Sequence, residues 1–440
     1  MAGGTFISQN KIRPGAYINF KSISKPSGKV GIRGISTIPI VLGWGPNDQL
    51  IEINSSDLSD GKILDKLGYY GYENEIVSIK EALKNSYKCL VFRVDSNGQK
   101  ATATIDSLNI VAKYPGTVGN RLSVSIKDVE NDKFEVKTFL DTKVVDVQLA
   151  SNIDELLGNC WVDFAGSGKL VANAGIKLTS GSNGTESIEN YSRYIDLINN
   201  KYFNTMGVYT TNEDVKEKIT TFIKQSREEK GKKIQCVIND FSEANYEGVI
   251  SVDQGYKTKD TTVGVNGFVG YVTGLTSGAS LNKSNTYTVI PGAVEIINPK
   301  TDDEIKEGIR KGKFIITFRQ DESVVVETDI NTFTDFSSTK SRDFCKNRVI
   351  RTLDDINNSI KNMFEKTYLG KINNNEDGRT SFKSDIISYL KELNKLGAIE
   401  DFKNEDISIS VGNEIDSVLV DIGIKPIDAM EKLYMTVSVG

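Results

Sequence analysis

Histidine is absent from the chain. Without an imidazole there is no Ser-His-Asp triad, no HExxH zinc site and no histidine acid–base catalyst. The four cysteines are far apart and form no CxxC pair, so we expect buried or half-buried free thiols rather than a zinc site or a disulfide framework; they are Cys89, Cys160, Cys236 and Cys345. The lack of histidine and of paired cysteines therefore excludes many classes of enzyme.

Long apolar runs are also missing. No stretch approaches the roughly 20 apolar residues that span a bilayer, and the N-terminal MAGGTFISQNKIRPG lacks the apolar core of a signal peptide. The net charge of −5 argues against a protein that mainly grips nucleic acid or anionic lipid. We therefore expect synthesis in the cytoplasm, no direct nucleic-acid partner and no membrane insertion.

With 440 residues the chain is long enough for several domains. Residues 1–37 form an arm, in which the alternating strand RPGAYINF precedes the Ser- and Gly-rich linker SISKPSGKVGIRGIS. A strand on such a linker must find a pairing partner, because it cannot satisfy its own backbone groups. Residues 38–98 have a strand–helix–strand pattern, which is typical of a parallel sheet with a crossover helix.

From about residue 99 to 182 the period of the sequence changes to two. Segments such as RLSVSIKD and KFEVKTFL alternate between turn residues and predict an inserted all-β domain, a sandwich or a barrel. Helical and strand patterns resume over 183–335 and predict the rest of an α/β layer.

The last region, 336–440, begins with a long amphipathic helix over 342–368. Its apolar residues are spaced four, three, four and three apart: Val349, Leu353, Ile356, Ile360 and Met363. A second helix (SFKSDIISYLKELNKLG), the strands ISISVG and SVLVDIGIKP, and a final alternating strand, KLYMTVSVG, follow. The predicted fold class is therefore α/β with an inserted all-β domain and a C-terminal α/β domain.

Several short motifs resemble chemical sites but fail in detail. AGSGKL has Asp163 and Leu170 where a phosphate loop needs Gly and Ser or Thr, so it predicts a hairpin turn. NNNEDG has Ser384 where a calcium loop needs Glu, so it predicts a helix–helix turn. The pairs Asp302-Asp303 and Asp354-Asp355 are interpreted as a helix N-terminus and a solvated helix face. We predict no catalytic, metal or cofactor-binding residues.

The long helix also carries a row of basic side chains. One interpretation is a solvated face, balanced by neighbouring acidic residues; the other is a face that meets an acidic protein partner. The residues concerned are Lys346, Arg348, Arg351, Lys361 and Lys366.

The chain resembles the contractile tail sheath proteins of bacteriophages and phage-tail-like bacteriocins. The resemblance is carried by VIRTLDDINNSIKNMFEKTYLGKINNNEDGR (349–379), LKELNKLGAIEDF (390–402) and KPIDAMEKLYMTVSV (425–439), together with RPGAYINF and YPGTVGNRLSVSI (114–126). It implies a subtilisin-like α/β domain, in topology only, with a β-sandwich insert and a C-terminal domain facing the tail tube. It also implies hexameric rings stacked around the tube, with baseplate and tail-terminator proteins as further partners, in a virion tail or a released particle.

The resemblance also implies that both terminal strands add to sheets of neighbouring subunits. The exchanged residues would be Ala16, Tyr17, Ile18 and Phe20 at one end, and Leu433, Met435, Val437 and Val439 at the other. The other possibility is that both ends pair within their own domain. Two further alternatives for the whole chain are an α/β enzyme with an accessory β domain and a secretion-system-type sheath component.

Overall fold

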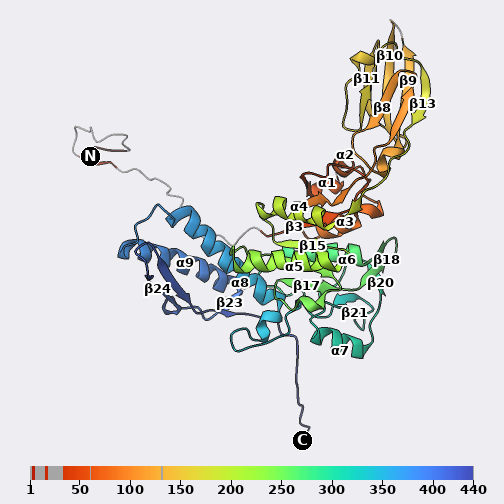
Figure 1. Ribbon diagram of the computed structural model, residues 1–440. Helices are drawn as coiled ribbons and strands as arrows, with labels where there is room; N and C mark the ends of the chain where they lie inside the picture. The colour runs from red at the N-terminus through yellow and green to blue at the C-terminus, as the bar shows by residue number, and fades with distance from the viewer. Residues whose placement is uncertain (1, 5–14, 18–32, 60, 130–131, 440) are drawn as a thin grey trace. The chain divides into compact units, whose positions relative to one another are not determined.

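The computed structural model describes residues 2–4, 15–17, 33–59, 61–129 and 132–439. The chain divides into two compact units, which are described separately (Figure 1). The larger unit contains Ile32–Asn358 and Pro426–Gly440, and the smaller contains Met1–Gly31 and Ser359–Lys425. The predicted mixed α/β class is confirmed, since helices and sheets occur in both units.

A six-stranded sheet forms the centre of the larger unit. Its order is β17-β16-β15-β3-β5-β4, and all neighbours are parallel except β4, which runs antiparallel to β5. The bounds are β3 (Ile35–Ile40), β4 (Leu50–Asn54), β5 (Lys88–Arg93), β15 (Thr205–Val208), β16 (Gln235–Asn239) and β17 (Val249–Val252). Most residues of these strands are buried, as expected for a sheet that is covered on both faces.

Helices cover both faces of this sheet. α4 (Ile188–Asn199) and α5 (Glu213–Glu228) share one apolar cluster with the strands, whereas α6 (Val265–Gly278) belongs to another, which also contains Val77 of α3 (Val77–Leu83). α3 and α6 pack with almost no space between them: a Cβ placed on Gly270 or Gly274 would lie 2.1 Å from a carbonyl oxygen of α3. The two glycines therefore allow close helix packing, because a side chain at either position would collide with α3.

Two further sheets form the inserted domain. One has the order β11-β10-β9-β13 and the other β12-β8-β7, with a common core that includes Trp161. The bounds are β7 (Thr102–Ile105), β8 (Leu108–Ala112), β9 (Leu122–Val129), β10 (Lys133–Leu140), β11 (Lys143–Ala150), β12 (Val162–Ala165) and β13 (Asn173–Lys177). Trp161 stacks on Trp44 with ring centroids 5.3 Å apart, so the insert and the α/β layer share one apolar cluster. AGSGKL begins at the last residue of β12 and contains two glycines with positive φ, which suits a turn. The predicted hairpin is wrong, because β12 pairs with β8 whereas the next strand, β13, pairs with β9.

Smaller elements complete the larger unit. They are α1 (Ser55–Ser59), α2 (Lys62–Leu67), β6 (Asp95–Ser96), β14 (Thr185–Glu186), β18 (Gly255–Thr258), β19 (Thr262–Val263), β20 (Ala293–Ile297), α7 (Asp302–Arg310), β21 (Ile316–Phe318) and β22 (Val324–Val326). α7 begins with a capping box between Thr301 and Glu304. Asp302 and Asp303 lie in its first turn, so their prediction as a helix N-terminus is confirmed.

The smaller unit is built around α9 (Glu376–Leu396). α8 (Asn347–Met363) begins in the larger unit and continues into a π-helical turn, Phe364–Tyr368. The Asn375 side chain caps α9 by accepting the Gly378 N–H at 2.9 Å, so NNNEDG is a helix–helix turn as predicted. The strands of this unit are β23 (Ile399–Glu400), β24 (Ile407–Val411) and β25 (Val418–Ile422); β26 (Lys425–Pro426) lies at the unit boundary.

Candidate assembly surfaces

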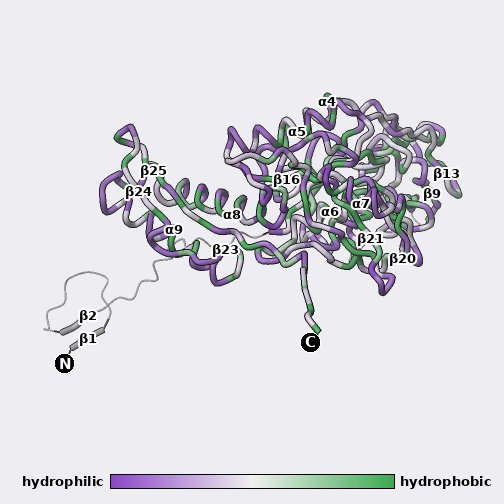
Figure 2. The backbone as a smooth tube through the Cα atoms, turned by 90° about the horizontal axis from the view of Figure 1, so that it is seen from below, coloured by the Kyte–Doolittle hydropathy of each residue, from purple (hydrophilic) through white to green (hydrophobic). Residues whose placement is uncertain are grey.

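The C-terminal segment is apolar and almost fully exposed. Leu433, Met435, Val437 and Val439 are 85%, 73%, 69% and 93% exposed, and no helix or strand is assigned to residues 427–439. Figure 1 and Figure 2 both show the segment extending away from the rest of its unit. Isolated exposed apolar side chains are ordinary, but a consecutive alternating set marks an interaction site.

The N-terminal candidates lie at the edge of the described residues. Ala16 and Tyr17 belong to β2 (Gly15–Tyr17), which pairs in parallel with β1 (Ala2–Gly4). Ile18 and Phe20 lie outside the described residues. The alternating N-terminal strand therefore stays a prediction.

The hairpin of β24 and β25 offers two open edges. The two strands pair only with each other among the described strands. Beside β24, a groove is lined by Ile409, Ser410 and Val411 together with side chains of the first two turns of α9. A two-stranded sheet is only marginally stable by itself, so a further strand would stabilise it.

The basic residues of α8 lie in two different environments. Arg351 is 0% exposed and donates from Nη2 to Asp329 Oδ2 at 3.0 Å and to the Lys283 carbonyl at 2.8 Å. Arg348 is also buried, which lowers the pKa of its guanidinium. These two side chains therefore face the interior of the larger unit and are not available to a partner in this structure.

The remaining three basic candidates are more accessible. Lys346 is half-buried and forms an ion pair with Glu431. Lys361 and Lys366 are exposed, and Lys361 lies 3.9 Å from the Glu365 carboxylate. Neither a solvated helix face nor a face that meets an acidic partner therefore describes all five basic residues.

The interpretation of Asp354 and Asp355 as a solvated helix face is wrong, because each is only 5% exposed. Asp354 accepts two hydrogen bonds from Arg227 of α5, at 2.7 and 2.8 Å. Burial alone lowers the pKa of Arg227, but the Asp354 charge and hydrogen bonds outweigh it and raise the pKa. The pair ties α8 to α5, and sequence spacing gives no signal for it, since 127 residues separate the partners.

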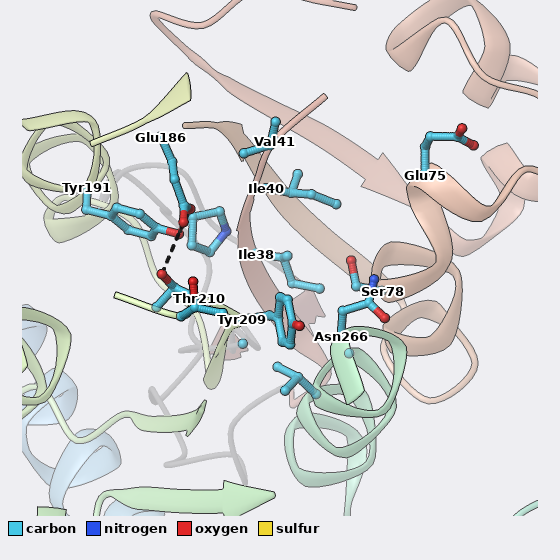
Figure 3. A pocket seen from close by; sticks show the side chains of 15 residues that line it. Ile38, Ile40, Val41, Glu75, Ser78, Glu186, Tyr191, Tyr209, Thr210 and Asn266 are labelled. Carbon is cyan, nitrogen blue, oxygen red and sulfur yellow. Dashed lines mark hydrogen bonds between the residues drawn. The ribbon is translucent and has the colours of Figure 1, made fainter. Parts of the chain in front are cut away.

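A cavity of about 270 Å³ lies where β3 and β15 end (Figure 3). The strands that follow β3 along the chain, β4 and β5, lie on one side of it in the sheet, and β16, which follows β15, lies on the other. Strand order therefore reverses between β3 and β15, a position at which α/β proteins often bind ligands. In Figure 3, Tyr191 and Thr210 point toward Glu186; its carboxylate accepts the Tyr191 hydroxyl at 2.8 Å and the Thr210 hydroxyl at 3.2 Å. Burial raises the pKa of Tyr191, so this phenol stays neutral.

The cavity does not combine groups in a catalytic arrangement. Ser78 lines it, but among the described residues its hydroxyl forms no hydrogen bond with a carboxylate that could act as a base. The described part of the chain also contains no group of His, Cys, Asp and Glu placed to hold a metal ion, and none of its helices could cross a bilayer. The four cysteines are free, and Cys89, Cys236 and Cys345 are buried, as predicted. Cys160 is exposed, so the expectation of a buried or half-buried thiol is wrong for this residue.

Family models match the chain in four consecutive parts. Residues 33–94 match the model of "Tail sheath protein Gp18 domain III N-terminal region", and residues 96–183 match that of the phage tail sheath protein beta-sandwich domain. Residues 184–332 match the phage tail sheath protein central domain, and residues 339–440 the phage tail sheath C-terminal domain. All four descriptions name the same kind of protein.

Relatives and solved structures agree with these matches. The sheath tail protein of Desulfitobacterium hafniense is 36% identical, with a TM-score of 0.87 over 96% of this chain and 99% of its own. That of Listeria innocua is 31% identical, with a TM-score of 0.77 over 93% and 96%. The phage-like element PBSX protein XkdK of Bacillus subtilis is 31% identical over 100% of each chain.

The chain therefore belongs to the contractile tail sheath family and is a contractile tail sheath subunit. The anti-feeding prophage helical sheath, solved in its contracted state, shares the fold at 11% identity, with a TM-score of 0.58 over 97% of this chain and 99% of that one. Membership of this family indicates a structural rather than a catalytic role.

Proposed function

We propose that the chain polymerises as stacked hexameric rings around a tail tube, anchored by baseplate and tail-terminator proteins, and contracts to drive the tube through a target envelope. It would be made in the cytoplasm and assembled into a phage tail or a released phage-tail-like particle. We further propose that the six-stranded layer is subtilisin-like in topology. The lack of histidine excludes the catalytic triad of that protease.

The observation that carries this proposal is the exposed, alternating C-terminal segment. Leu433, Met435, Val437 and Val439 would all lie on one side of an extended strand. Leaving four large apolar side chains in water is unfavourable by about 1.5–3 kcal/mol each relative to full burial. A strand added to another subunit would bury them and satisfy the backbone N–H and C=O groups of the segment.

The β24–β25 hairpin is the acceptor that best fits such a strand. Its edges are unpaired within the described part of the chain, and a groove runs beside β24. Donor and acceptor are different segments of the chain, so the contact is heterologous and can propagate through a lattice. The N-terminal strand RPGAYINF would occupy an edge in the same way.

Exchanged strands would keep subunits connected while rigid domains rotate during contraction. The extended sheath would be metastable, so that contraction releases stored free energy through better packing. About 2–3 kcal/mol per subunit, the order of a few interface contacts, would suffice when summed over a long sheath. No nucleotide is needed in this scheme.

Deleting residues 433–440 tests the proposal. The variant should keep the melting temperature of the full chain, because these side chains contact little of their own unit, but it should form no long sheaths in electron micrographs. A matched control replaces Thr436 and Ser438, on the opposite side of the strand, by Gln and should still assemble. Normal polymerisation of the truncated chain contradicts the proposal. Deleting residues 1–22 tests the other arm in the same way.

The contact with the tube is the second part of the proposal, and it now rests on Lys361 and Lys366. Both are exposed, whereas Arg348 and Arg351 are committed to the interior. Reversing both lysines to Glu should uncouple sheath from tube in co-assembly assays while the monomer stays folded. Unchanged co-assembly would remove these residues from the interface.

A further inference from the structure

The exposed C-terminal segment begins at a fixed point. Glu431 accepts the Thr286 hydroxyl on Oε1 at 2.8 Å and the Lys346 ammonium on Oε2, and its side chain is only 16% exposed. From Lys432 to Val439 every described residue is exposed. Glu431 is therefore the root of the C-terminal arm, the position from which the arm leaves the unit.

Behind this root lies a buried polar network centred on Asp329, which is 1% exposed. Its carboxylate accepts the Asn285 N–H at 3.0 Å, the Asn347 side-chain amide at 2.9 Å and the Arg351 guanidinium at 3.0 Å. Its own N–H donates to the Thr286 hydroxyl at 2.9 Å. Thr286 thus links the hydrogen bonds around Asp329 directly to Glu431.

A second set of contacts, near the end of α6, holds Arg33, the first described residue after the gap at residues 18–32. Arg33 donates from Nε to the Ala279 carbonyl at 3.1 Å and from Nη2 to the Thr276 carbonyl at 3.2 Å, at the C-terminal end of α6. The next two N–H groups, of Gly34 and Ile35, both donate to Asn204 Oδ1. Arg33 is therefore the root of the N-terminal arm.

Residues 279–286 connect the two roots. Arg33 binds the first residue of this segment and Glu431 binds the last. Between them, the Lys283 carbonyl accepts Arg351 at 2.8 Å and the Leu281 carbonyl accepts the Thr352 hydroxyl at 3.4 Å, so α8 clamps the segment along its length.

We propose that residues 279–286, held by Asp329 and α8, form a junction that fixes the positions of both arm roots, Arg33 and Glu431. This inference rests on the proposed function in so far as the arms engage other copies. Thr286 and Arg33 are then positioning residues of the sheath lattice. A force on one arm is then transmitted to the root of the other through residues 279–286 and the groups bound to them, rather than through the whole fold.

The test measures arm mobility in the free monomer. A nitroxide label is placed on Lys432→Cys in a Cys160→Ser background, because the other three cysteines are buried. Thr286→Val removes the hydroxyl that joins Asp329 to Glu431 and should shorten the rotational correlation time of the label by about half. Thr288→Val is the matched control: the same change two residues away, at a hydroxyl that forms no hydrogen bond within the described residues, should leave the label unchanged.

Arg33→Gln tests the shared junction, because Arg33 does not contact the arm that carries the label. It should also increase the mobility of the label, by less than Thr286→Val. If Thr286→Val and Thr288→Val behave alike, the junction does not hold the C-terminal arm and the proposal fails. If Thr286→Val loosens the arm but Arg33→Gln does not, the roots are independent and the shared junction is overturned.

The monomer experiment is separate from the assembly assay. If arm deletion leaves polymerisation intact, the proposed function fails, while the label still decides whether the junction exists. Circular dichroism melting of each variant checks that the fold is preserved.

Discussion

β10 of the inserted domain and the C-terminal arm have the same kind of sequence but opposite surroundings. KFEVKTFL and KLYMTVSV both alternate large apolar and other residues. In β10 the alternate side chains are buried, and β9 and β11 pair with both of its edges. In the arm the corresponding side chains are exposed, and no strand of the described chain pairs with residues 432–439.

The difference shows that alternation specifies a strand but not the location of its partner. An alternating pattern indicates which side chains of a strand are buried when the strand joins a sheet. That sheet can belong to the same chain or to another copy. The basic residues of α8 and of the π-helical turn after it divide in a similar way: Arg351 is hydrogen-bonded to Asp329 inside the unit, whereas Lys361 and Lys366 are exposed.

The largest expected effect is the difference in unfolding free energy between a charged substitution in β10 and one in the C-terminal arm. Val136→Asp places a carboxylate in the core of the inserted domain and should lower the free energy of unfolding by about 5 kcal/mol, because the buried charge has no partner. Val437→Asp, in the arm, should leave that free energy unchanged yet block sheath assembly. Urea denaturation and electron microscopy measure the two outcomes. Strong destabilisation by Val437→Asp would show that the arm packs on its own subunit in solution.

A smaller difference in stability is expected between removing the buried charge of Asp354 and reversing the exposed charge of Lys361. Asp354→Ala leaves the Arg227 guanidinium buried without its carboxylate and should cost about 3–5 kcal/mol. Lys361→Glu, on the exposed part of α8, should change stability by no more than about 0.5 kcal/mol. Chemical denaturation of both variants gives the comparison, and the double variant Arg227→Met/Asp354→Leu should recover most of the loss. Equal effects of the two single variants would contradict the burial of the pair.

The smallest effect is a difference in pH dependence between Asp57 and Asp428. Burial alone raises the pKa of Asp57, but the Lys66 ammonium and the Asn54 N–H outweigh it, so the folded pKa lies below the unfolded value. Its contribution to stability is present above the unfolded pKa and is lost as the pH falls through the folded pKa. Asp57→Asn should therefore destabilise the chain at pH 7 and have little effect in strong acid.

Asp428, near the arm root, should behave in the opposite way. Burial raises the pKa of its carboxyl above the unfolded value, so its ionised form opposes folding at pH 7. Stability from this group decreases as the pH rises through the interval between the unfolded and folded pKa values. Asp428→Asn should slightly raise the melting temperature at pH 7, and the gain should vanish below the unfolded pKa. The same sign of effect for both aspartates would contradict the assignment.

Much of the fold could be predicted from local patterns. The apolar spacing of Val349, Leu353 and Ile356 located the long helix, and Asn375 and Gly397 cap α9 at its two ends. The buried charges could not be predicted, because the spacing reports the apolar face of a helix but not the surface that covers its other sides. Asp354 looked solvated in sequence since nothing local indicates that α5 covers it.

By itself, the sequence determined the absence of imidazole chemistry, the mixed α/β class and the alternating pattern of the C-terminal segment. These properties depend on residue types and on local periodicity, which act over a few residues. Only the tertiary structure decided that Arg227 pairs with Asp354, and that Arg33 and Glu431 bind the two ends of residues 279–286. Such partners are far apart in the chain, and the energy of a buried charge depends on the groups that folding brings around it.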